Sequence, residues 1–264
     1  MATKQKIKRS GKKKAPKYIK SKAKLANIIK VKNTERIVNT VVGCIGSGKT
    51  YETKKVIKRY IKRYPKERVL IIDPNDEYNE YPKIKVKDIA NFKKPSRICL
   101  YALNADERRN ILQNIAWYYK NGLLVIEDFN SITYYRTATI EFTGAITCCR
   151  TRDIDVIITF NSILSIESTI MQNTHAYRFH KIIEDRIPET YIMSNKYGDI
   201  PINYIKAECE INTKKPKYPF VYFDTVNQKI VSVTKNLFTL WSACVKHLSP
   251  TIDKLCKDVV YGKN

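Results

Sequence analysis

Short apolar segments alternate with longer amphipathic segments through the middle of the chain. Near-continuous apolar runs predict buried strands at residues 37–42, 68–73, 97–101, 123–126, 154–160 and 176–180. Between them, apolar positions three and four residues apart predict helices at residues 51–61, 106–120, 134–149 and 162–172. Strands that are apolar on both faces and alternate with helices are typical of a mostly parallel sheet covered on both faces. The pattern therefore predicts an α/β domain.

The two ends of the chain have a different character. Residues 1–35 are rich in Lys and low in complexity, which predicts a flexible basic tail. After about residue 206, apolar runs at 218–224 and 230–233 predict a hairpin, and residues 237–260 predict one or two closing helices. We therefore expect three parts: a tail (1–35), a globular domain (36–205) and a small C-terminal extension (206–264).

The charge is strongly positive. The 264 residues hold 49 Lys and Arg against 25 Asp and Glu, a formal net charge of +24. Thirteen of the basic residues lie in the first 32 positions, so the remainder still carries 36 − 25 = +11. A basic tail on a basic body suggests a polyanionic partner such as nucleic acid. The alternative is a solubilising tail on a protein in which Lys is simply common.

No apolar run approaches the ~20 residues that a membrane-spanning helix needs. The basic N-terminus has no apolar segment behind it, so a secretory signal is not indicated. The seven Cys form no Cys-x-x-Cys pair and no zinc pattern with the three His. We therefore expect a soluble intracellular protein with reduced thiols.

Residues 43–50 read Gly-Cys-Ile-Gly-Ser-Gly-Lys-Thr, which matches the phosphate-binding pattern Gly-x-x-x-x-Gly-Lys-Thr at every fixed position. The glycines let backbone N–H groups turn toward a triphosphate, Lys49 can reach its β- and γ-oxygens, and the Thr50 hydroxyl can bind Mg²⁺. The predicted strand before the loop and helix after it are the setting that this chemistry requires. A chance Gly-Ser turn is the alternative. The predicted nucleotide-binding residues are Gly43, Cys44, Ile45, Gly46, Ser47, Gly48, Lys49 and Thr50.

Two carboxylates, Glu127 and Asp128, follow the apolar strand at 123–126. Ligands bind at the carboxyl ends of parallel strands, so this pair can hold a metal ion and activate water. Asn161 ends the strand at 154–160 and can contact the γ-phosphate or the attacking water. The alternatives are an ordinary acidic turn and an Asn that merely stops a strand.

Arg150 and Arg152 end the helix that precedes the strand at 154–160. Either can stabilise transition-state charge on a neighbouring subunit's nucleotide, as an arginine finger does. The alternative is that both cations simply complement the dipole of a helix C-terminus.

Four sequence motifs, in their order along the chain, resemble those of the FtsK–HerA superfamily of DNA-pumping ATPases. They are the loop at 43–50, the string at 71–78 that contains Asp-Pro-x-x-Glu-Tyr, the strand and acids at 123–128, and the Arg-containing segment that leads to Asn161. The resemblance spans about residues 36–180 and implies a RecA-like P-loop NTPase that uses ATP and Mg²⁺. Two positions depart from the family pattern, which usually has Asp before Glu and a Gln where Asn161 stands. By position, Glu127 would bind Mg²⁺ with Thr50, and Asp128 would activate the water.

A basic tail, an ATPase core and a short extension resemble the layout of viral genome-packaging ATPases. The resemblance implies an ATP-driven translocase of double-stranded DNA that forms a homo-oligomeric ring, with a capsid or portal-vertex protein as a further partner. It implies a place in the host cytoplasm or the virion. Other pumps of this superfamily, for conjugation or filamentous-phage assembly, stay open as alternatives. So do a P-loop kinase of a nucleoside or small metabolite, and a nucleic-acid-binding protein with a relic nucleotide site.

Overall fold

The computed structural model describes residues 36–132, 140–184, 218, 220–225 and 229–232. The predicted tail (1–35) and closing helices (237–260) lie outside the described residues, as does the first part of the predicted helix at 134–149. The division into three parts therefore stays a prediction.

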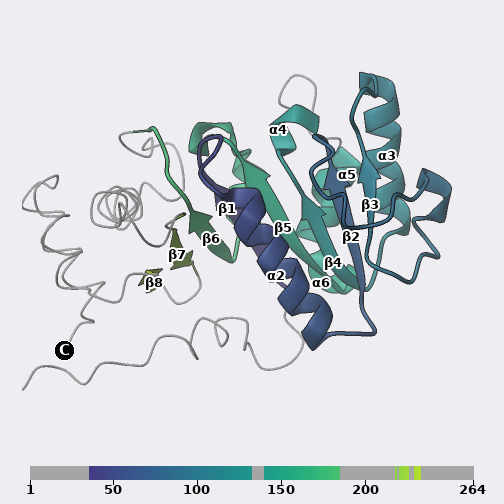
Figure 1. The fold of residues 1–264 in the computed structure, drawn as a ribbon, viewed down its shortest axis with the longest axis horizontal. Helices are drawn as coiled ribbons and strands as arrows, with labels where there is room; N and C mark the ends of the chain where they lie inside the picture. Colours follow the sequence, from purple (N-terminus) through teal and green to yellow (C-terminus); the bar gives the residue numbers. More distant parts are fainter. Residues whose placement is uncertain (1–35, 133–139, 185–217, 219, 226–228, 233–264) are drawn as a thin grey trace, which may run out of the picture. The chain divides into compact units, whose positions relative to one another are not determined.

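The described strands form one sheet of eight, in the order β3-β2-β4-β5-β1-β6-β7-β8 (Figure 1). Neighbouring strands from β3 to β6 are parallel, whereas β6 with β7 and β7 with β8 are antiparallel. The predicted hairpin is thus confirmed, and it extends the same sheet. The strands are β1 (Val38–Val42), β2 (Arg68–Asp73), β3 (Ser96–Cys99), β4 (Gly122–Ile126), β5 (Ile154–Phe160), β6 (Ala176–Phe179), β7 (Val221–Asp224) and β8 (Lys229–Ser232).

The helices follow the predicted positions with three differences. Helix α4 was not predicted, because four residues are too few to show a helical period. The segment at 162–172 is not one helix, because Ile166 and Glu167 have extended backbones. Residue 148 separates α5 from α6. The helices are α2 (Lys49–Arg63), α3 (Ala105–Tyr118), α4 (Phe129–Ile132), α5 (Ile140–Thr147), α6 (Cys149–Arg152) and α7 (Ser168–Asn173), with 3₁₀ turns η1 (Val86–Asp88) and η3 (Ile163–Ser165).

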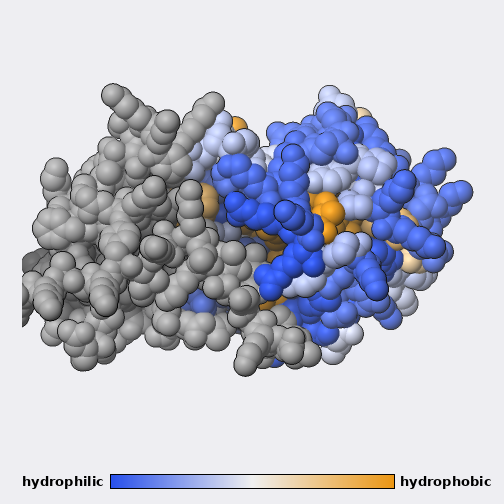
Figure 2. Space-filling model, turned by 60° about the horizontal axis from the view of Figure 1, so that its bottom comes forward, coloured by the Kyte–Doolittle hydropathy of each residue, from blue (hydrophilic) through white to orange (hydrophobic). Residues whose placement is uncertain are grey.

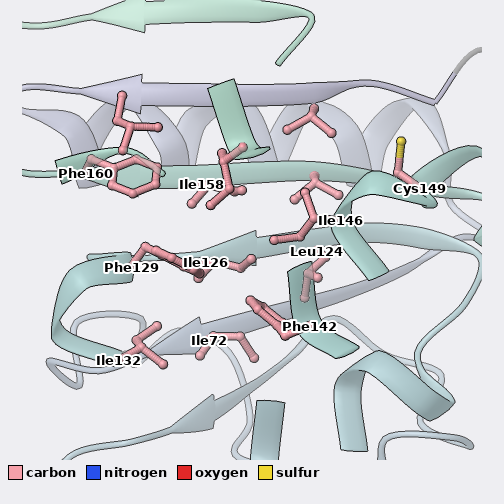
Figure 3. Packing of buried hydrophobic residues seen from close by; sticks show 14 of the residues in the cluster. Ile72, Leu124, Ile126, Phe129, Ile132, Phe142, Ile146, Cys149, Ile158 and Phe160 are labelled. Atoms are coloured by element: carbon pink, nitrogen blue, oxygen red, sulfur yellow. The ribbon is translucent and has the colours of Figure 1, made fainter. Parts of the chain in front are cut away.

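Each central strand contributes to two cores, one on each face of the sheet. On β4, Leu124 and Ile126 join the larger core, whereas Leu123 and Val125 join the smaller one. This alternation follows from the two-residue period of a strand. Helix α2 covers the smaller core and crosses the near face in Figure 1, while α5 and α6 lie behind the sheet. Figure 3 shows the larger core, where α5 packs over the middle strands. Helices on both faces of a mostly parallel sheet confirm the predicted α/β fold.

Two local features fix the β3 side of the sheet. Helix α3 begins with a capping box, in which Asn104 Oδ1 accepts from Glu107 N at 3.0 Å and Glu107 Oε2 accepts from Asn104 N at 2.9 Å. Residues 82–84 pair with the outer side of β3: Ile84 N donates to Arg97 O, and Arg97 N donates to Pro82 O, both at 2.9 Å.

Across the part of the chain that is described, none of the helices has the length and apolar character needed to cross a bilayer.

Candidate active site

The strand order places the predicted site residues side by side. Strand β5 lies between β1, which leads into the 43–50 loop, and β4, which leads into the two acids. All three strands are parallel, so their carboxyl ends share one edge of the sheet. The loop, the acids and Asn161 therefore meet at that edge, as the sequence predicts.

The loop at 43–50 is held to the sheet at its first residues. Gly43 N donates to Phe160 O at 3.2 Å, and Cys44 N donates to Lys181 O at 2.8 Å. Gly48 has φ +90°, a left-handed backbone, and a Cβ there would lie 2.3 Å from the Tyr218 ring. Only glycine combines this conformation with so close an approach. The loop then passes directly into α2.

Lys49 is turned back into its own loop. Its Nζ donates to Gly43 O at 2.6 Å, to Cys44 O at 3.1 Å and to Asn161 Oδ1 at 2.9 Å. Burial lowers the pKa of Lys49, and the charges of Glu127 and Asp128 partly offset this effect. The ammonium group is thus held at the sheet edge, in the electrostatic field of both acids.

Asn161 connects the lysine to the second acid. Its Oδ1 accepts from Lys49, and its Nδ2 donates to Asp128 Oδ1 at 2.7 Å. An amide can serve both partners because it carries an acceptor and a donor. Asp128 has φ +43°, in the left-handed region that Asp and Asn tolerate better than most residues. One side chain on β5 therefore joins the β1 and β4 parts of the site.

Glu127 is enclosed: only 4% of its surface is exposed. Its Oε1 accepts from the Tyr78 hydroxyl, and its Oε2 accepts from Thr159 Oγ1 at 2.8 Å. Thr159 Oγ1 in turn accepts from Asp128 N at 2.7 Å. Burial raises the pKa of Glu127, and the two hydroxyl donors act against that rise. The carboxylate is thereby fixed in one orientation.

Sequence reasoning did not identify Tyr78 or Thr159. Tyr78 ends the string at 71–78, whose first acid, Asp73, accepts from Glu77 N and Tyr78 N, both at 3.0 Å. Arg97 holds Asp73 from the other side through a buried ion pair of 2.7 Å. The string thus shapes a turn that brings the Tyr78 hydroxyl to Glu127. Position in this string was the available signal for Tyr78.

A second group that sequence reasoning missed lies beside the loop, on β6 and just after it. Arg178 is 1% exposed, and its Nη2 donates to Thr53 Oγ1 at 2.5 Å and contacts Lys49 O at 3.4 Å. His180 is fully buried, and its Nδ1 lies 3.1 Å from Ser47 O, so this nitrogen carries the proton. Burial and then the Arg178 charge lower the pKa of His180 well below its usual value. The imidazole is therefore neutral near pH 7.

Comparison with known families agrees with this geometry. The family described as the helicase HerA central domain matches residues 28–227, more than half of the chain. The chain belongs to the HerA central-domain family. It is therefore a P-loop ATPase of the FtsK–HerA superfamily, which supports ATP hydrolysis as its chemistry. No curated protein gives a significant match in sequence.

Solved structures show the same fold. The genome packaging NTPase B204 from Sulfolobus turreted icosahedral virus 2, in complex with AMP, has a TM-score of 0.54 and 19% identity, covering 76% of this chain and 97% of that chain. Its complex with AMPPCP gives 0.53 and 19%, with 75% and 97% covered. B204, the DNA-packaging ATPase from Sulfolobus turreted icosahedral virus, gives 0.51 and 18%, also with 75% and 97% covered.

The site offers oxygen donors of the type that Mg²⁺ prefers. The Thr50 hydroxyl in the first turn of α2 and the Glu127 carboxylate are the side chains that would hold the ion. Among the described residues, no group of three or more His, Cys, Asp and Glu forms a cage for a metal ion. A sparse oxygen set suits an ion that also binds phosphates and water.

The two arginines lie elsewhere in the chain. Arg150 and Arg152 belong to α6, which precedes β5, whereas Asn161 follows β5. The seven residues of β5 separate the two ends by roughly 20 Å. Arg150 is exposed, and Arg152 Nη1 contacts Tyr119 O at 3.5 Å. The chain does not bring either arginine to its own 43–50 loop.

Proposed function

We propose that this HerA-family chain is an ATP-driven translocase of double-stranded DNA that packages a viral genome. One observation carries the ATPase part of the proposal. Asn161 joins Lys49 of the phosphate loop to Asp128 of the acidic pair, so a phosphate-binding cation and a candidate base lie next to each other. This juxtaposition is what in-line attack of water on a terminal phosphate requires.

The two acids differ in what surrounds them, and this difference supports a division of their roles. Both oxygens of Glu127 are held by hydroxyl groups inside the protein, which suits a fixed anion beside Mg²⁺. Asp128 is half-buried and has one oxygen on Asn161, which suits a group that orients and deprotonates water. Lys49 would bind the β- and γ-phosphates. Mg²⁺, held by Thr50 and Glu127, would neutralise charge on the phosphates.

The DNA part of the proposal depends on family membership and charge. HerA-family membership favours a DNA pump over a small-molecule kinase, and the net charge of +24 suits a polyanion contacted without sequence preference. The packaging role rests on the layout and on the fold shared with B204. A ring of identical subunits, a capsid partner and a place in the host cytoplasm or virion belong to the same proposal.

Removing the cation or the base tests the site. We expect Lys49→Ala to abolish ATP turnover, and Asp128→Asn to lower it about 10²–10⁴-fold, the range typical of a lost general base. Asn also tolerates the left-handed backbone at 128, so the fold should be kept. The measurement is phosphate release with and without double-stranded DNA. Lys55→Ala, which removes a salt bridge of 2.7 Å to Glu52 within the same helix, is the matched control. Full activity in either site variant would remove the proposed site.

A further inference from the structure

Helix α2 carries an unusually basic outer face. Residues 53–66 contain seven Lys and Arg and no Asp or Glu. Four of these residues lie in the second half of the helix, away from the 43–50 loop, and are exposed: Lys58, Arg59, Lys62 and Arg63. We call these four residues the α2 stripe. Figure 2, in which the bottom of the view in Figure 1 comes forward, shows that most of the coloured surface is hydrophilic, with some apolar residues near its centre.

The stripe faces away from the sheet. The buried residues of α2 include Thr53, Ile57 and Tyr60, which share the opposite face of the helix. With about 100° per residue, the stripe covers an arc of roughly 140° that lies across the axis from that buried face. Its members form two rows of (i, i+4) pairs, each spaced about 6 Å along the axis. The charges are therefore presented together to solvent.

Nearby acids are already engaged by other cations. Glu52 pairs with Lys55 at 2.7 Å, and Glu67 pairs with Arg36 at 2.9 Å. Glu80 pairs with Lys54 at 3.1 Å, and Lys58 adds a weaker electrostatic effect that helps lower the pKa of Glu80. Within the described part of the chain, no ion pair or hydrogen bond is formed by the α2 stripe. Among the described residues, the stripe therefore has no salt-bridge partner, and only Lys58 acts weakly on an acid, Glu80.

We infer that the α2 stripe is a contact surface for the phosphate backbone of DNA. The inference rests on the proposed function, which supplies DNA as the partner, and adds where the chain holds it. Lys and Arg that contact phosphates contribute affinity without reading sequence, which is what a translocase needs. Because the phosphate loop passes directly into α2 at Lys49, the stripe lies on the helix that continues the loop. A pulling force from bound DNA on the stripe would therefore act on helix α2, which carries Lys49 at its start.

The test neutralises the stripe in the full chain. The variant Lys58→Gln, Arg59→Gln, Lys62→Gln, Arg63→Gln keeps side-chain length and helix propensity while removing four charges. The control removes four exposed charges from the segment before β3: Lys85→Gln, Lys87→Gln, Lys93→Gln, Lys94→Gln. Binding of a fluorescent 30-base-pair duplex is measured by anisotropy at several salt concentrations, together with ATP turnover without DNA.

The stripe variant should keep its DNA-free ATP turnover and lose much of its DNA affinity at moderate salt. The slope of log K against log salt should fall by about 3 to 4, close to 0.9 for each lost phosphate contact. The control should lose less than about 1. An unchanged slope in the stripe variant, or an equal loss in the control, would overturn the inference. Absence of DNA binding by the unaltered chain would instead refute the proposed function.

Discussion

Hydroxyl groups organise the carboxylate at the centre of the site. Glu127 is held by Tyr78 from the turn after β2 and by Thr159 from β5, so its two oxygens are fixed by two different elements. A hydrogen bond to a charged group contributes about 1.5–3 kcal/mol, and leaving such a group unpaired when buried costs at least as much. The orientation of Glu127 therefore depends on two residues that lie outside the 43–50 loop.

Tyr78→Phe isolates this contribution. We expect turnover at saturating ATP to fall roughly tenfold, the effect of about 1.4 kcal/mol, and the Mg²⁺ concentration for half-maximal turnover to rise. The KM for ATP should change less than about twofold, because Lys49 and the loop are untouched. Steady-state kinetics at varied ATP and Mg²⁺ provide the measurement.

Tyr81→Phe is the matched control for this substitution. The Tyr81 ring packs 6.4 Å from the Tyr78 ring in the same core, and no described hydrogen bond uses its hydroxyl. It should behave like the unaltered chain. If both variants lose turnover equally, the loss comes from core packing and not from the hydroxyl on Glu127.

The lowered pKa of His180 predicts that the free energy of unfolding depends on pH. Its pKa in the folded chain lies well below the usual 6.5, so below about pH 6.5 the unfolded chain binds more protons than the folded one. Stability should therefore fall with falling pH, by at most ~1.4 kcal/mol per pH unit from this residue. Urea unfolding at pH 7.5, 6.5 and 5.5 measures the slope.

His180→Asn removes the titration but can still donate to Ser47 O. The variant should lose part of the acid destabilisation. Glu127 acts in the opposite sense, because its pKa is raised by burial, so stability from a protonated Glu127 is gained on acidification. Glu127 is present in both proteins, so the difference between their slopes belongs to His180. Equal slopes would contradict the prediction.

The sequence predicted the site residues that belong to a contiguous motif or directly follow an apolar run. It missed those whose role depends on which strands become neighbours in the folded chain. Lys49 lies in a contiguous motif, and Glu127, Asp128 and Asn161 each follow an apolar run. Thr159 and Arg178 sit inside such runs, where a polar residue gives no sign of the strand that will lie beside it. Their partners are 32 and 125 residues away in the chain.

At the scale of elements, apolar runs gave the strands with small errors, and periodicity gave the two long helices. Strand β2 was predicted with both of its ends, because Arg68 precedes and Asp73-Pro74 follow a continuous apolar run. The short helices were less predictable. In the segment at 162–172, packing of Ile163 and Ile170 into the same core imposes a break that helical spacing alone does not reveal.

The order of the strands in the sheet also explains why motifs that are far apart in the sequence form one site. Strand β1, which leads to Lys49, and strand β4, which leads to Asp128, are not neighbours. Strand β5 lies between them, at about 4.8 Å from each. A side chain at the end of β5 therefore reaches both. The shorter side chain of Asn161, compared with the Gln usual in the family, still spans this gap, with contacts of 2.9 and 2.7 Å.

At the scale of the whole molecule, Arg150 lies far from the 43–50 loop of its own chain. It can therefore contribute to ATP hydrolysis only at the site of a neighbouring chain. If the exposed Arg150 serves a neighbour's nucleotide, Arg150→Ala should have little ATPase activity alone. Mixing it with the inactive Lys49→Ala should restore part of the activity, because each variant supplies what the other lacks. Phosphate release across mixing ratios measures this.

Arg109→Ala, which removes an exposed arginine on α3, is the control and should remain active alone. Lack of any recovery in the mixtures, with both variants folded, would count against an arginine that acts between subunits.

The pairing of residues 82–84 with β3 has a consequence for how copies of this chain can associate. Pro82 and Ile84 already occupy the backbone groups of Arg97 on that side of β3, which disfavours addition of a strand from a second molecule at this point. In the ring proposed above, contacts across this flank would therefore be made by side chains. Such contacts would let neighbouring copies in the ring shift relative to one another, which a shared sheet would prevent.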